Sequence, residues 1–138
     1  MENIEVANLA ELEPLSDFLH DSDLDIDTFG YDRSRAEITV IFRKELWEYR
    51  VPLGGFIFVK HKTPVGEFVL TVSNVTSYEL GDTERIGLYS LRKLSFDPVE
   101  KRIEFECPVP LHFVVDVSGL KIQLKKLSNE PAWVERRI

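Results

Sequence analysis

The feature that most constrains this chain is an alternation of apolar and polar residues that begins at Leu24 and continues almost to the C-terminus. Apolar side chains at every second position give a strand one buried face and one wet face. Turn-forming residues such as Asp32–Arg35 separate the alternating runs. We therefore predict one mainly β domain over residues 1–138, an antiparallel sandwich or partly open barrel of about eight or nine strands built from hairpins.

One short N-terminal helix is expected between about Ala10 and His20. Its apolar positions recur at three- and four-residue spacing: Leu12, Leu15, Phe18 and Leu19. Pro14 is acceptable in the first turn of a helix but awkward further inside. The ordered helix is therefore expected to begin near Glu13.

The alternating runs predict several hairpins. Residues 24–42 form the first, with one extra residue near Thr28 that indicates a bulge. Residues 94–105 have the same outline at a constant offset from residues 29–40, which predicts a second hairpin with the same kind of turn. The strands 111–117 and 120–127 are expected to form a last hairpin, and Thr63–Gly66 is expected to break the chain.

Charge divides the chain unequally. The net charge is −7, yet residues 1–32 contain ten Asp or Glu and no Lys or Arg, whereas residues 33–138 contain 17 basic and 14 acidic residues. This pattern predicts an acidic N-terminal segment (1–32) packed on a nearly neutral β body (33–138). Such a segment repels nucleic acid and anionic lipid and attracts a basic protein. We expect no nucleic-acid partner and no membrane partner.

Four alternate aspartates are the main candidate binding residues: Asp21, Asp23, Asp25 and Asp27. On an extended chain they share one side, and oxygen donors of this kind suit calcium or magnesium. The spacing does not match a helix–loop–helix calcium loop, and carboxylates two residues apart on a strand lie about 6.5–7 Å apart, too far for one compact metal shell. The stripe is otherwise a solvated acidic edge or a surface for a basic partner.

Catalytic signals are weak elsewhere. His20 followed by Asp21 has the elements of a general base with an orienting carboxylate, although a histidine at a helix C-terminus also fits there without catalysis. Cys107 lies in an alternating run, where a buried inert thiol is common. No metal or cofactor is expected. The polar segment 76–89 is a candidate recognition loop through Tyr78 and Tyr89, which also fit half-buried strand positions.

Several stretches resemble small uncharacterised bacterial β domains, some of which belong to toxin–immunity systems. The resemblance lies in Leu19–Ser22, Phe29–Asp32, Ile38–Val40, Ser77–Leu80 and Ile86–Tyr89. It implies a non-catalytic binding protein and supplies no catalytic residues.

We therefore interpret the chain as a non-catalytic protein-interaction domain whose acidic N-terminal edge binds a basic partner. The alternative is a carboxylate-based metal-binding protein or a hydrolase centred on His20 and Asp21–Asp27. A single cysteine and the absence of an export signal lead us to expect a cytoplasmic protein. The oligomeric state is not predicted.

Overall fold

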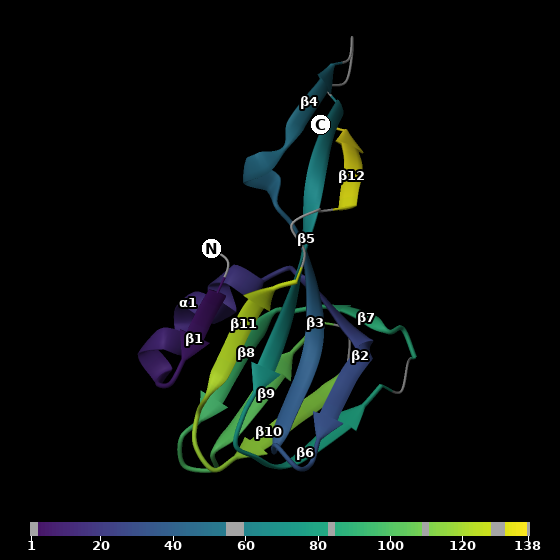
Figure 1. The fold of residues 1–138 in the computed structure, drawn as a ribbon. Coiled ribbons are helices and arrows are strands. Elements are labelled where there is room, and N and C mark those ends of the chain that lie inside the picture. Colours follow the sequence, from purple (N-terminus) through teal and green to yellow (C-terminus); the bar gives the residue numbers. More distant parts are fainter. Residues whose placement is uncertain (1–2, 55–59, 83–84, 109–110, 128–131, 138) are drawn as a thin grey trace.

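The computed structural model describes residues 3–54, 60–82, 85–108, 111–127 and 132–137, and it contains two antiparallel sheets and one α-helix (Figure 1). The elements are β1 Asn3–Val6, α1 Leu9–Leu19, β2 Asp23–Asp32, β3 Glu37–Glu45, the 3-10 helix η1 Trp47–Tyr49, β4 Val51–Gly54, β5 Lys60–Val72, β6 Val75–Gly81, β7 Leu88–Ser90, β8 Lys93–Asp97, β9 Arg102–Glu106, β10 His112–Val117, β11 Ile122–Lys126 and β12 Ala132–Arg137. The mainly β prediction is confirmed, with twelve strands in the described residues in place of about eight or nine.

The two sheets form an open sandwich and do not close into a barrel. The larger sheet has the order β1-β11-β5-β3-β2-β7, with β4 and β12 also paired to β5, and the smaller sheet has the order β6-β10-β9-β8. Alternate residues of each sheet face the other and make one core, which includes Phe42 and Leu70 from the larger sheet and Phe105, Phe113 and Val115 from the smaller. Burial of these apolar faces is the main source of stability in such a sandwich.

Helix α1 begins at Leu9, four residues before the expected start. Asn8 caps it, because the Asn8 Oδ1 accepts from the Glu11 N–H at 3.0 Å, and the Glu11 Oε1 in turn accepts from the Ala7 N–H at 3.2 Å. Pro14 therefore lies inside the helix, and the expected start at Glu13 is wrong. Pro14 is exposed, so water can reach the carbonyl that its missing N–H leaves without a partner.

The two predicted hairpins with similar outlines are confirmed as β2–β3 and β8–β9. Their turns also match in detail. Asp32 and Asp97 each accept hydrogen bonds from backbone N–H groups of their own turn. Four residues later, Ala36 and Lys101 both adopt a left-handed conformation with φ 53°. The repeated outline therefore reflects one type of aspartate-capped turn used twice.

The predicted hairpin of residues 111–117 and 120–127 is wrong. β10 pairs with β6 and β9 in the smaller sheet, whereas β11 pairs with β1 and β5 in the larger one. The chain crosses from one sheet to the other at Ser118–Lys121. Val117 and Ile122 are therefore buried in the same core from opposite sides. The alternating pattern is the same in both arrangements, because either one buries every second residue.

The predicted break at Thr63–Gly66 is also wrong, because β5 runs through it without interruption. On one side of β5, β4 pairs with residues 60–62 and β3 with residues 65–72, which leaves Pro64 between two partners. The Pro64 carbonyl there accepts from the Leu46 N–H at 2.8 Å. A residue without an N–H is tolerated at this gap in the ladder.

Candidate functional site: the cleft between α1 and β8

Among the residues that the structure describes, strand β8 pairs with β9 alone and forms one edge of the smaller sheet. In an antiparallel edge strand, the backbone groups of alternate residues point away from the neighbouring strand. In β8 these residues are Leu94 and Phe96, because the Leu94 N–H is directed at α1, where it donates to the Ser16 Oγ at 2.9 Å. The outward side of β8 therefore presents backbone donors and acceptors to the helix.

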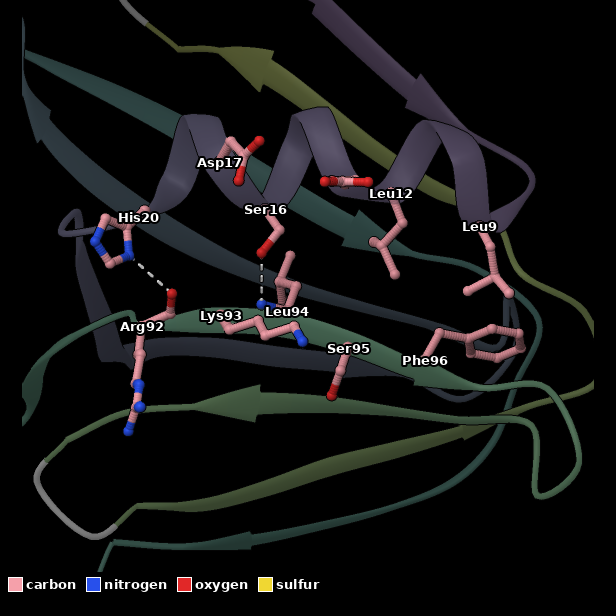
Figure 2. A pocket seen from close by; sticks show the side chains of 11 residues that line it. Leu9, Leu12, Ser16, Asp17, His20, Arg92, Lys93, Leu94, Ser95 and Phe96 are labelled. Carbon is pink, nitrogen blue, oxygen red and sulfur yellow. Dashed lines mark hydrogen bonds between the residues drawn. The ribbon is translucent and has the colours of Figure 1, made fainter.

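α1 uses two side chains to cover part of this edge (Figure 2). Ser16 accepts from Leu94, and the His20 Nδ1–H donates to the Arg92 carbonyl at 2.8 Å. A carbonyl can only accept, so this bond requires the proton on Nδ1. The His20 Nε2 lies 3.4 Å from the Asp21 Oδ2. His20 therefore links the end of α1 to the residue that directly precedes β8.

A cleft of about 630 Å³ lies between α1 and β8. In Figure 2, Leu9 and Leu12 extend from the helix toward the strand that carries Phe96. Leu12 is buried, whereas Leu9 is 50% exposed, so the N-terminal end of the cleft is apolar and open. Three further backbone groups of β8 face this same side: the Leu94 carbonyl and the N–H and carbonyl of Phe96.

Charged side chains of both signs line the cleft. Glu13 and Asp17 come from α1, while Lys93 begins β8 and Arg92 directly precedes it. All four residues are exposed. The cleft thus combines an apolar floor, strand-edge backbone groups and charges, which are the elements that recognise an extended peptide.

The structure places the four predicted aspartates in different surroundings. Asp21 lies in the turn after α1 with φ 64°, and its side chain is 78% exposed. Asp23, Asp25 and Asp27 alternate along β2, as predicted. Asp25 is mostly buried and accepts from the Arg43 guanidinium, whose other carboxylate neighbour is Glu67.

Asp25 is therefore committed to an internal ion pair, which raises the pKa of Arg43. Asp27 lies beside the positive-φ Gly87, where a Cβ would come within 3.1 Å of the Asp27 Oδ2. Within the described ranges, no three His, Cys, Asp or Glu side chains are placed to hold a metal ion. The four aspartates form a stripe and not a convergent cluster.

The two predicted tyrosines are separated by the fold. Tyr89, on β7 of the larger sheet, is 1% exposed, and its hydroxyl donates to the Asp82 carboxylate. Tyr78, on β6 of the smaller sheet, is 36% exposed and packs against Phe29 and Tyr31, with ring centroids 5.1 Å away in both cases. Tyr89 is a core residue, and Tyr78 belongs to an aromatic cluster at the sandwich margin.

Cys107 directly follows β9 and is half-buried, and burial raises the pKa of its thiol to about 11. A thiol of this kind holds little thiolate near neutral pH and is a poor nucleophile.

Neither the cleft nor its central residue, Ser16, was predicted from the sequence. A serine on the apolar stripe of a helix was the available signal, because a buried hydroxyl there needs a hydrogen-bond partner. The partner, Leu94, lies 78 residues away, and only the fold shows that they meet.

Comparison of the chain with family models, curated proteins and solved structures returned no match. No helix in the described part of the chain is long and apolar enough to cross a membrane.

Proposed function

We propose that this chain is a protein-binding domain that holds an extended segment of its partner along β8, in the cleft against α1. One observation carries the proposal: the outward backbone groups of Leu94 and Phe96 line an open cleft next to Leu9 and Leu12. An added strand would gain main-chain hydrogen bonds from the edge and specificity from side-chain pockets. The apolar end of the cleft suits one apolar side chain of such a segment.

The acidic helical rim of the cleft favours basic residues in the partner segment. Glu13 and Asp17 form the helical rim, and the segment 1–32 that carries them has ten acidic residues and no Lys or Arg. Attraction of this kind accelerates association more than it increases affinity. We therefore infer a partner segment that is extended and carries basic residues and one apolar anchor. Arg92 and Lys93 at the other end of the cleft would accept an acidic residue.

The test is selection from a library of extended nine-residue peptides that contain Lys or Arg and one large apolar residue, followed by titration of the labelled protein. Selected peptides should slow hydrogen exchange at the Phe96 amide, because an added strand would hydrogen-bond to it. Leu9→Asp should weaken binding about tenfold or more. Leu127→Asp is the matched control, because Leu127 is 51% exposed and lies outside the cleft. Equal binding by both variants, with an unchanged Phe96 amide, would refute the proposal.

The alternative, a metal site or hydrolase centred on His20 and Asp21–Asp27, has no supporting geometry in the described residues. The His20 Nδ1 is bonded to a carbonyl, and Asp25 is paired with Arg43. We therefore expect millimolar Ca²⁺ or Mg²⁺ to leave the melting temperature unchanged. A rise in melting temperature that is lost in an Asp23→Asn/Asp25→Asn variant would support a metal site at these aspartates.

A further inference from the structure

The end of α1 closes the strand edge just before β8. The Asp21 N–H donates to the Leu91 carbonyl at 2.8 Å, and the Leu91 N–H donates to the Ser22 carbonyl at 2.9 Å. The His20 Nδ1–H covers the next residue by donating to the Arg92 carbonyl. Residues 20–22 therefore hold the place of a neighbouring strand there, so a bound segment can pair only further along, on β8 itself.

Ser16 lies where this cover ends (Figure 2). Its Oγ accepts from the Leu94 N–H at 2.9 Å. In a continuous ladder that N–H would donate to a carbonyl of the added strand, so the Ser16 Oγ lies in the place of a strand carbonyl. Beyond it, the Leu94 carbonyl and both backbone groups of Phe96 face the cleft. A bound segment can therefore pair with these three groups while Ser16 keeps the Leu94 N–H.

The Ser16 hydroxyl also has an unused donor. Ser16 is 8% exposed and lines the cleft. Its own proton has no acceptor among the residues that the structure describes. A hydroxyl can accept and donate at the same time, and a buried polar group of this kind requires a partner. The donor is thus available to a molecule that occupies the cleft.

We propose that the Ser16 hydroxyl donates to a backbone carbonyl of the bound segment and fixes the register of that segment on β8. Ser16 acts within the cleft of the proposed function, on which this assignment rests, as a specificity-determining residue. The Leu94 N–H donates to the Ser16 Oγ, and the Ser16 O–H donates to the carbonyl of the segment. Hydrogen bonds in such a chain polarise and strengthen one another.

The packing of α1 favours this bridge over displacement of the helix by the bound segment. Leu12, Leu15 and Leu19 belong to the core and are 4%, 0% and 0% exposed. Lys44 of β3 also holds the helix, because its Nζ donates to the Phe18 carbonyl. A segment that took the Leu94 N–H for itself would have to move α1 away, which would expose these apolar side chains to water. Donation from Ser16 requires no such movement.

Pairing that stops at Ser16 also restricts the sequence of the segment. Two of its N–H groups are needed, one for the Phe96 carbonyl and one for the Leu94 carbonyl. In either strand direction these N–H groups belong to residues two positions apart. Proline has no N–H, so it should be excluded at both positions and tolerated at the residue between them.

Titration of the tightest peptide from the nine-residue library tests the Ser16 assignment. Ser16→Ala should raise the dissociation constant of that peptide about three- to tenfold. Thioamide analogues then replace its carbonyl oxygens one at a time with sulfur, which is a poorer acceptor. One analogue should bind the wild type more weakly than the parent peptide does, yet bind Ser16→Ala as well as the parent. General destabilisation of the protein would not produce this dependence on a single carbonyl.

Gly66→Ala is the control for stability, because its new Cβ would lie 2.8 Å from the Phe68 Cε2 and Gly66 does not line the cleft. It should lower the free energy of unfolding about as much as Ser16→Ala does and bind the parent peptide like the wild type. Slow hydrogen exchange at the Phe96 amide in the Ser16→Ala complex would show that this variant is folded and that the peptide still pairs with β8.

Equal or tighter binding by Ser16→Ala would overturn the assignment, because a segment that displaces Ser16 gains from removal of the hydroxyl. It would also be overturned if no carbonyl depends on Ser16, or if no two positions two residues apart reject proline. In each case, slow exchange at the Phe96 amide would leave the proposed function standing. If no library peptide slows exchange at Phe96, the proposed function fails and the Ser16 assignment fails with it.

Discussion

Removal of the Ser16 hydroxyl tests whether α1 closes the edge of β8 as the structure shows. Ser16 is 8% exposed and Leu94 is 2% exposed, and the bond between the Ser16 Oγ and the Leu94 N–H is 2.9 Å long. Ser16→Ala leaves that N–H buried without an acceptor, which costs about 1–3 kcal/mol. Alanine recovers about 0.5 kcal/mol through its higher helix propensity. We therefore expect the free energy of unfolding to fall by about 1–2 kcal/mol.

Urea denaturation followed by far-UV circular dichroism measures this loss, and a 138-residue domain should melt about 3–6 °C lower. Hydrogen exchange supplies a local measurement, because the Leu94 amide should exchange faster in the variant. Ser95→Ala is the control on the same strand. Ser95 is half-buried, and its hydroxyl makes no hydrogen bond within the described residues, so its replacement should cost less than about 0.5 kcal/mol.

Two results together would refute this reasoning: equal stability of the two variants and unchanged exchange at Leu94. They would mean that the Leu94 N–H has another acceptor, such as water. The edge of β8 would then be open along its whole length, and Ser16 would not set the boundary of the peptide cleft.

Three further predictions concern other parts of the fold. Gly66→Ala should lower the free energy of unfolding, measured by urea denaturation, by about 1–3 kcal/mol, because the new Cβ would lie 2.8 Å from the Cε2 of the buried Phe68. Unchanged stability would show that the ring can shift. Cys107, with a pKa of about 11, should react with a disulfide reagent at pH 8 far more slowly in the native protein than in urea, and equal rates would contradict its burial. The guanidinium of Arg102 and the Ser77 hydroxyl lower the pKa of Asp116 in the folded protein. The contribution of Asp116 to stability is therefore present above about pH 4 and is lost as the pH falls through the lower folded pKa. Asp116→Asn should flatten the acid side of a plot of unfolding free energy against pH, and an unchanged slope would contradict this.

Local chemistry predicted those parts of the fold that depend on neighbours in sequence. The aspartate-capped turns of β2–β3 and β8–β9 were recognisable because each turn satisfies its own backbone. The start of α1 was also encoded locally, but the prediction of a start near Glu13 rested on Pro14 alone. Asn8 followed three residues later by Glu11 is a recognisable helix start, and it decides the boundary.

Sheet membership was not predictable in the same way. Residues 111–127 alternate as a hairpin does, yet the chain crosses the core between β10 and β11. A period of two records which residues are buried, and a strand in either sheet of a sandwich buries the same ones. Only the pairing partner distinguishes the two cases, and that partner is remote in sequence.

The acidic stripe on β2 shows the same limit at the level of function. The spacing of Asp23, Asp25 and Asp27 placed them correctly along one strand, but their meaning depends on the strand beside them. The pairing of β2 with β3 brings Arg43 next to Asp25 and neutralises the middle of the stripe. Asp21, in the turn before β2, and Asp23 are instead exposed. The same residue type at the same spacing thus serves an internal ion pair at one position and a surface at another, and the register between β2 and β3 makes the difference.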